Sequence, residues 1–177
     1  MARHVVLLPG VNLGSRNRVA MPALRDALAD AGFEEVRTYL QSGNVVLSST
    51  RSPAQVAREC EGRIRDAFGL EITVIVRTRA ELEKVVKRNP LGAVAANPKR
   101  YQVSFLERRL GREAARKVEE AAVAPEQVVV DGREIYAWHP ETIARSRLWA
   151  LLAGRDLGVA ATARNWTTVT KLLELAD

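Results

Sequence analysis

The chain has 177 residues and a hydrophobic fraction of 47%, which is ordinary for a globular protein and suits one larger domain or two small units. Its formal net charge is +6, and only five of its 27 basic residues are Lys. The longest apolar run, residues 148–153, is far shorter than the ~20 residues of a membrane-spanning helix, and the run after residue 4 is too short for a signal peptide. We therefore expect a cytoplasmic protein without a membrane partner.

Cysteine and histidine are scarce. Cys60 is the only cysteine, so an intrachain disulfide is excluded, and only His4 and His139 accompany it. We expect no metal site and no cofactor. Cys60 shares a predicted helix face with Val56 and Ile64, which indicates a small buried hydrophobe rather than a reactive thiol.

The first half of the chain predicts a strand, a helix, two strands, a helix, a strand and a helix. Capping boxes at residues 52–55 and 78–81 mark two helix starts, and Ser42-Gly43 marks a hairpin turn. The predicted elements are a strand at 5–8, a helix at 22–31, strands at 36–40 and 45–48, a helix from 53, a strand at 72–76 and a helix at 79–88. A polar loop at residues 9–20 separates the first strand from the first helix.

The second half repeats this order. Its predicted elements are a strand at 103–106, a helix at 112–122, strands at 127–130 and 134–138, a helix at 146–153, a strand at 159–163 and a last helix capped by Asn165. Asp131-Gly132 is a hairpin turn that corresponds to Ser42-Gly43, and Arg77 corresponds to Arg164 at the end of the last strand of each half. These matches predict an internal duplication.

The order βαββαβ is typical of the ferredoxin-like motif. The predicted fold is therefore α+β, with duplicated ferredoxin-like βαββαβ(α) units packed into one globular protein. Two prolines, a glycine and three alanines interrupt the periodic pattern around residues 90–100. We interpret residues 1–89 as the first unit, 90–100 as a connecting segment and 101–177 as the second unit.

Four ordered segments resemble the family named domain of unknown function 1697, and the resemblance covers nearly the whole chain. The segments are residues 7–14 (LLPGVNLG), 36–46 (VRTYLQSGNVV), 145–148 (RSRL) and 163–172 (ARNWTTVTKL). The resemblance implies no activity. Members of the family usually carry Arg where this chain has Pro9 and Gly where it has Ser15, so any ligand contact made by that Arg is lost or relocated here.

The loop at residues 9–20 has a much shorter counterpart in the second half, at residues 107–111. Long loops are usually functional or disordered, and Gly, Asn and Arg near a helix start are able to hold an anion. A plain surface loop, a plain hairpin turn and a solvated basic face are the structural alternatives. The candidate ligand-binding residues are Asn12, Gly14, Ser15, Arg16, Ser42, Gly43, Asn44, Arg145, Arg164 and Lys171.

The sequence contains no recognisable catalytic motif, and His139 has no obvious partner, so whether the protein is an enzyme stays open. The leading hypothesis is a binding module for a small anionic or nucleotide-like ligand. The alternatives are an enzyme acting on a phosphorylated small molecule and weak, salt-sensitive, sequence-independent nucleic-acid binding. The sequence assigns no oligomeric state.

Overall fold

The computed structural model describes residues 1–141, 143 and 145–177. The chain divides into two compact units. The first unit contains Met1–Lys84 and Lys171–Asp177, and the second contains Val85–Thr170. The division at residues 1–89, 90–100 and 101–177 stays a sequence-based interpretation. Within the described residues, no helix has the length and apolar character that crossing a membrane requires.

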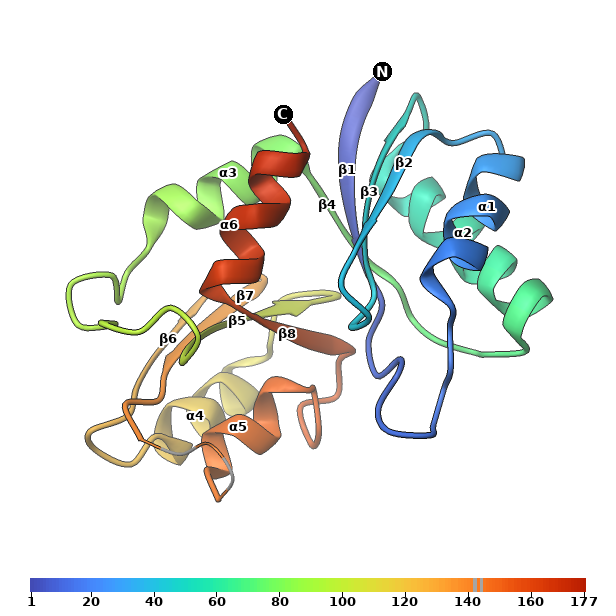
Figure 1. Cartoon of the computed structure of the whole chain (residues 1–177). Helices are drawn as coiled ribbons and strands as arrows, with labels where there is room; N and C mark the ends of the chain where they lie inside the picture. The colour runs from blue at the N-terminus through green and yellow to red at the C-terminus, as the bar shows by residue number, and fades with distance from the viewer. Residues whose placement is uncertain (142, 144) are drawn as a thin grey trace. The chain divides into compact units, whose positions relative to one another are not determined.

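The first half of the chain forms a four-stranded antiparallel sheet with the strand order β2-β3-β1-β4. Helices α1 and α2 lie together beside this sheet (Figure 1). The elements are β1 (Ala2–Leu7), α1 (Met21–Asp30), β2 (Glu34–Tyr39), β3 (Asn44–Ser49), α2 (Pro53–Phe68), β4 (Ile75–Thr78) and α3 (Arg79–Arg88).

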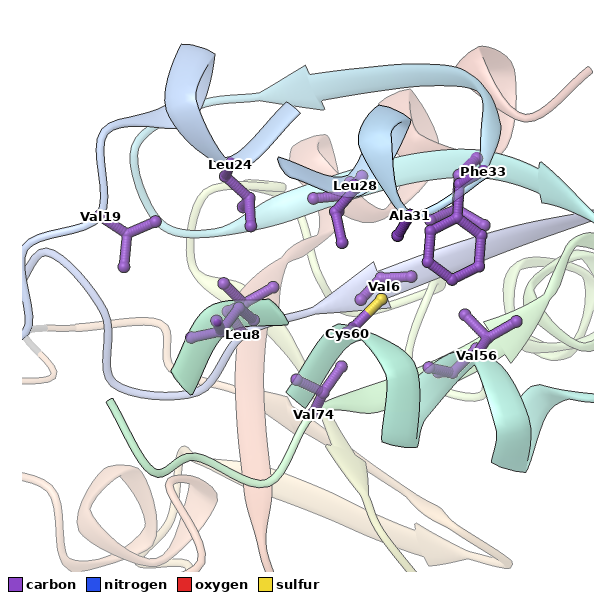
Figure 2. Close-up of a cluster of buried hydrophobic side chains, with 14 of the residues drawn as sticks. Val6, Leu8, Val19, Leu24, Leu28, Ala31, Phe33, Val56, Cys60 and Val74 are labelled. Carbon is purple, nitrogen blue, oxygen red and sulfur yellow. The ribbon is translucent and has the colours of Figure 1, made fainter. Parts of the chain in front are cut away.

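An apolar core joins α1 and α2 to one face of this sheet (Figure 2). Val6 of β1 belongs to the same buried cluster as Leu28 of α1 and Val56 of α2. Cys60 is fully buried in this cluster, and burial raises the pKa of its thiol to about 12. The prediction that Cys60 is an inert core residue is consistent with this position, because nucleophilic attack requires the thiolate.

The second half forms a sheet with the equivalent strand order, β6-β7-β5-β8. An apolar cluster joins the sheet to α4 and α5. The elements are β5 (Tyr101–Leu106), α4 (Arg112–Ala121), β6 (Gln127–Asp131), β7 (Glu134–Trp138), α5 (Arg147–Leu152), β8 (Ala161–Asn165) and α6 (Trp166–Leu175). The shared order of elements and strands confirms the duplicated ferredoxin-like α+β fold.

The two halves differ in their connections. In the first half a long loop at residues 8–20 joins β1 to α1, and residues 50–52 join β3 to α2. In the second half the first of these connections is the short one and the second is the long one. Residues 107–111 join β5 to α4, and residues 139–146 join β7 to α5. The long connection therefore follows the first strand of the motif in the first half and the third strand of the motif in the second half.

Most strands differ from their predicted bounds by one to three residues, and β4 and β8 begin later than predicted. The strand predicted at residues 72–76 begins only at Ile75, because the Val74 N–H donates to the Glu61 carboxylate of α2 at 3.0 Å. The strand predicted at 159–163 runs instead over 161–165, and its last residue, Asn165, also accepts from the Thr168 N–H at 2.9 Å to cap α6. In the first case a side chain from another element binds the backbone, which local sequence patterns do not encode.

His4 gives the first unit a predictable response to acid. It is buried in β1, and burial lowers the pKa of its imidazole, while the Ser49 backbone and the Glu81 charge act in the opposite direction. The unfolded chain binds a proton near pH 6.5 that the folded chain binds only at lower pH, so stability falls on acidification by up to about 1.4 kcal/mol per pH unit. Denaturation between pH 5 and 8 should show a steeper loss for the wild type than for His4→Leu, and parallel curves would contradict this.

Candidate functional site

The structure brings the long loop of the first unit against the β2–β3 turn, and Asn12 makes the connection. Its Nδ2 donates to the carbonyls of Val19 at 2.9 Å and Gln41 at 2.6 Å, and its Oδ1 accepts from the Val19 N–H at 2.8 Å. Both amide protons and the oxygen therefore already have partners. We conclude that Asn12 closes the loop and holds it to the turn, and that it has little capacity left for a ligand.

The turn residues Gly43 and Asn44 are buried and well packed. The Leu8 N–H donates to the Gly43 carbonyl at 2.9 Å. Asn44 donates through Nδ2 to the Tyr39 carbonyl at 2.8 Å and to Ser42 Oγ at 3.0 Å. The turn is thus built by its own side chains, as the hairpin interpretation requires.

Gly14, Ser15 and Arg16 lie at the exposed end of the loop. The end is a tight turn, in which the Asn12 N–H donates to the Asn17 carbonyl and the Arg16 N–H to the Leu13 carbonyl, each at 3.0 Å. Of the other predicted site residues in the first unit, Lys171 forms an ion pair with Glu174 at 2.9 Å.

Arg145 and Arg164 belong to the second unit and have different surroundings. The Arg164 side chain is buried in β8, and its Nη1 donates to Thr162 Oγ1 at 2.5 Å and to the Ala163 carbonyl at 2.9 Å. Burial lowers the pKa of this guanidinium to about 10. Its equivalent in the first half, Arg77, is also buried in its strand. Arg145, in contrast, is exposed.

Arg145 lines a hollow of about 320 Å³ in the second unit, and we call this feature the hollow throughout. The hollow lies where the α4–β6 and β7–α5 connections meet, and its floor and rim combine apolar, basic and acidic side chains. The lining residues are Val123, Ala124, Pro125, Glu126, His139, Pro140, Glu141, Arg145, Ser146 and Arg147.

Glu126 organises one wall of the hollow. Its Oε2 accepts from Ser146 Oγ at 2.5 Å and lies 2.9 Å from His139 Nδ1, while its Oε1 accepts from the Val123 N–H at 3.1 Å. Ser146 also caps α5 by accepting from the Trp149 N–H at 3.1 Å. One carboxylate therefore links the turn before β6, the residue after β7 and the first turn of α5.

These contacts determine the protonation state of the Glu126 carboxyl group. Burial by itself would raise the pKa of Glu126, but the hydrogen bonds from Ser146, His139 and Val123 outweigh it and the pKa lies below the usual range of a glutamate. Glu126 thus remains a carboxylate at neutral pH, and His139 Nδ1 carries a proton toward it. His139 Nε2 is buried and has no hydrogen-bond partner within the described part of the chain.

Ser146, His139 and Glu126 do not form a nucleophilic triad. In such a triad the serine hydroxyl donates to the imidazole, whereas Ser146 donates to Glu126. The pair that remains, a carboxylate holding an imidazole, orients a proton donor or acceptor. Across the described residues, no group of three or more His, Cys, Asp or Glu side chains is placed to bind a metal ion.

The partner of His139 follows from the register of its hairpin, although the sequence pattern by itself shows a lone histidine. Gln127 pairs with Trp138 in the β6–β7 ladder, so one step beyond the ladder places Glu126 next to His139. The hairpin turn at Asp131-Gly132 fixes this register. The Glu126–His139 pair was therefore predictable from the sequence by extending the hairpin.

Comparison with known proteins agrees with the fold and gives no activity. The family model described as "Protein of unknown function (DUF1697)" matches residues 1–136. The solved structure of the conserved bacterial protein SP0830 from Streptococcus pneumoniae has a TM-score of 0.82, with 22% sequence identity over 99% of each chain. No curated protein matches the chain.

Proposed function

The chain belongs to the DUF1697 family of proteins of unknown function, and from the geometry of the second unit we propose that it binds a small anionic ligand in the hollow. The observation that carries the proposal is the position of Arg145 and Arg147. Both guanidiniums are exposed at the hollow, and neither has an ion-pair partner among the described residues.

The charges at the hollow favour an anion. Arg145 and Arg147 repel each other when no counter-charge is present, and a bound anion relieves that repulsion. Two acids, Glu126 and Glu141, also line the hollow, but neither forms an ion pair with Arg145 or Arg147 among the described residues. The planar guanidinium also presents paired N–H groups that match a phosphate or carboxylate.

The size and composition of the hollow suit a small molecule. Its volume of about 320 Å³ lies at the lower end of the range for small-molecule sites. Val123, Pro125 and Pro140 provide apolar surface beside the arginines. A phosphorylated or carboxylated metabolite with an apolar body would bind the arginines through its anionic group and the apolar side chains through the rest of the molecule.

Thermal denaturation with inorganic phosphate and a panel of phosphorylated metabolites tests this site. A ligand at 100 times its Kd should stabilise the protein by about 2.7 kcal/mol. Arg145→Ala should weaken binding roughly tenfold, because it removes a charge-assisted hydrogen bond worth about 1.5–3 kcal/mol. Arg116→Ala is the matched control, because Arg116 is an exposed arginine of α4 outside the hollow, and it should bind as the wild type does.

Two outcomes would contradict the anion site. One is the absence of stabilisation by any anion in the panel. The other is an equal loss of binding in Arg145→Ala and Arg116→Ala, which would indicate a general charge effect. Arg164→Ala is not a clean test, because it removes a buried charged side chain from β8.

An enzyme acting on a phosphorylated small molecule is the second candidate function. The Glu126–His139 pair favours it, because a carboxylate that orients an imidazole prepares that ring to transfer a proton. The same metabolite panel, followed for release of inorganic phosphate, distinguishes an enzyme from a binding module. Turnover that survives in His139→Asn would exclude the proton-transfer role of this ring.

A further inference from the structure

The first unit carries a second surface that the anion site does not use. It consists of residues 12–18 of the β1–α1 loop and residues 37–41 at the end of β2, and we call it the tip. Asn12 Nδ2 joins the two segments through the Gln41 carbonyl at 2.6 Å. Asn17 Nδ2 donates to the Gly10 carbonyl at 3.1 Å and steadies the base of the loop. The tip is therefore a connected, internally bonded surface.

The tip is positively charged, and the acid closest to it in sequence that forms an ion pair, Glu35, pairs with Arg3 at 2.9 Å and not with an arginine of the tip. Arg16, Arg18 and Arg37 are exposed, and none forms an ion pair within the described residues. Residues 1–25 and 36–58 contain no Asp or Glu. Some other arginines of the first unit differ, since Arg25 pairs with Asp26 at 3.3 Å and Arg63 with Glu59 at 3.1 Å.

The tip also exposes two leucines. Leu13 is 65% exposed and Leu40 is 54% exposed. Leu40 in addition has φ +59°, a conformation that costs an L-residue roughly 1–2 kcal/mol. An exposed leucine in a strained backbone conformation contributes little to the fold, so a role outside the folded core is the simpler explanation.

We propose that the tip binds single-stranded nucleic acid. Phosphates would supply the counter-charge for the three arginines, and unstacked bases would cover Leu13 and Leu40 together with the half-buried Tyr39. A duplex hides the faces of its bases, so it would engage the arginines and leave the leucines in water. An acidic protein segment would supply charge but no flat apolar base. A flexible single strand of nucleic acid would provide phosphates for the arginines and base faces for the leucines.

Fluorescence anisotropy with a labelled 15-nucleotide single strand measures the interaction on the whole chain. Contacts from three arginines predict a slope of log affinity against log salt of about −2, which is roughly a 20-fold loss between 50 and 200 mM salt. The triple substitution Arg16→Ala, Arg18→Ala and Arg37→Ala should bring that slope close to zero. The double substitution Leu13→Ser and Leu40→Gly should weaken binding about fivefold and leave the slope unchanged.

Controls separate this binding mode from non-specific attraction. The triple substitution Arg58→Ala, Arg65→Ala and Arg116→Ala removes three exposed arginines outside the tip and should leave affinity and slope unchanged. A 15-base-pair duplex and poly-glutamate of similar length should bind more weakly than the single strand. The proposal is overturned if the single strand does not bind at 50 mM salt, if the duplex or poly-glutamate binds equally well, or if the two arginine triples lose affinity equally. Thermal denaturation confirms that each variant is folded.

Discussion

Glu126→Ala is expected to lower the free energy of unfolding by roughly 2–4 kcal/mol. The substitution removes the acceptor of three hydrogen bonds, from Val123 N–H, His139 and Ser146, and the part-buried donors of His139 and Ser146 are costly to leave without an acceptor. It also releases the link between the two connections that border the hollow. Chemical denaturation at pH 7 measures the loss directly.

The matched control is Glu141→Ala. Glu141 lines the same hollow but is exposed, and its removal should change the free energy of unfolding by no more than about 0.5 kcal/mol. Equal effects of the two substitutions would show that Glu126 has no special structural role.

The effect of Glu126 should also depend on pH. Its pKa is lowered in the folded protein, so its contribution is fully present above the unfolded carboxyl pKa of about 4.3 and is lost as the pH falls through the lower folded value. The wild type and Glu126→Gln should therefore approach each other in stability below about pH 4. A constant difference across this range would mean that the carboxylate charge does not matter.

Gly43→Ala is expected to cost roughly 3 kcal/mol or more. A Cβ at this position would lie 2.6 Å from Val11 Cγ2 and 2.8 Å from Leu8 Cβ, and the residue has φ +88°. Overpacking and left-handed strain thus act together. Because Gly43 lies where the turn meets the long loop, the loop should also become more accessible to proteolysis. Denaturation and limited proteolysis measure the two effects.

Gly14→Ala separates strain from packing. Gly14 also has a positive φ, +59°, but nothing lies within 4 Å of the position that a Cβ would take, so only the conformational cost of about 1 kcal/mol should remain. If Gly14→Ala were as destabilising as Gly43→Ala, the close approach of Leu8 and Val11 would not be the cause.

Local signals explain why so much of the fold was predictable. The capping box at Ser52 and Gln55 and the hairpin at Asp131-Gly132 involve residues close in sequence, and both occur in the structure as predicted. The start of β4 was predicted too early because the deciding contact comes from Glu61, in a different element. Patterns over a few residues do not contain such a contact.

The candidate site was harder to predict because the same residue types serve two purposes. An Asn in a glycine-containing loop is suited to hold an anion and equally suited to bond the loop to itself, and Asn12 and Asn44 do the latter. Arg164 was a candidate ligand-binding residue, yet its side chain is buried in β8. Glu126, in contrast, could have been identified as the partner of His139 by extending the β6–β7 register by one residue pair.

The unequal connections have a consequence for stoichiometry. A duplicated protein begins with two equivalent places for every ligand, and an unmodified repeat would bind two molecules per chain. Here the β1–α1 connection (residues 8–20) is longer than its counterpart at residues 107–111, and the β7–α5 connection (residues 139–146) is longer than its counterpart at residues 50–52. The two halves therefore present different connecting segments on the same βαββαβ motif. A ligand recognised by either elaborated connection should therefore saturate at one molecule per chain.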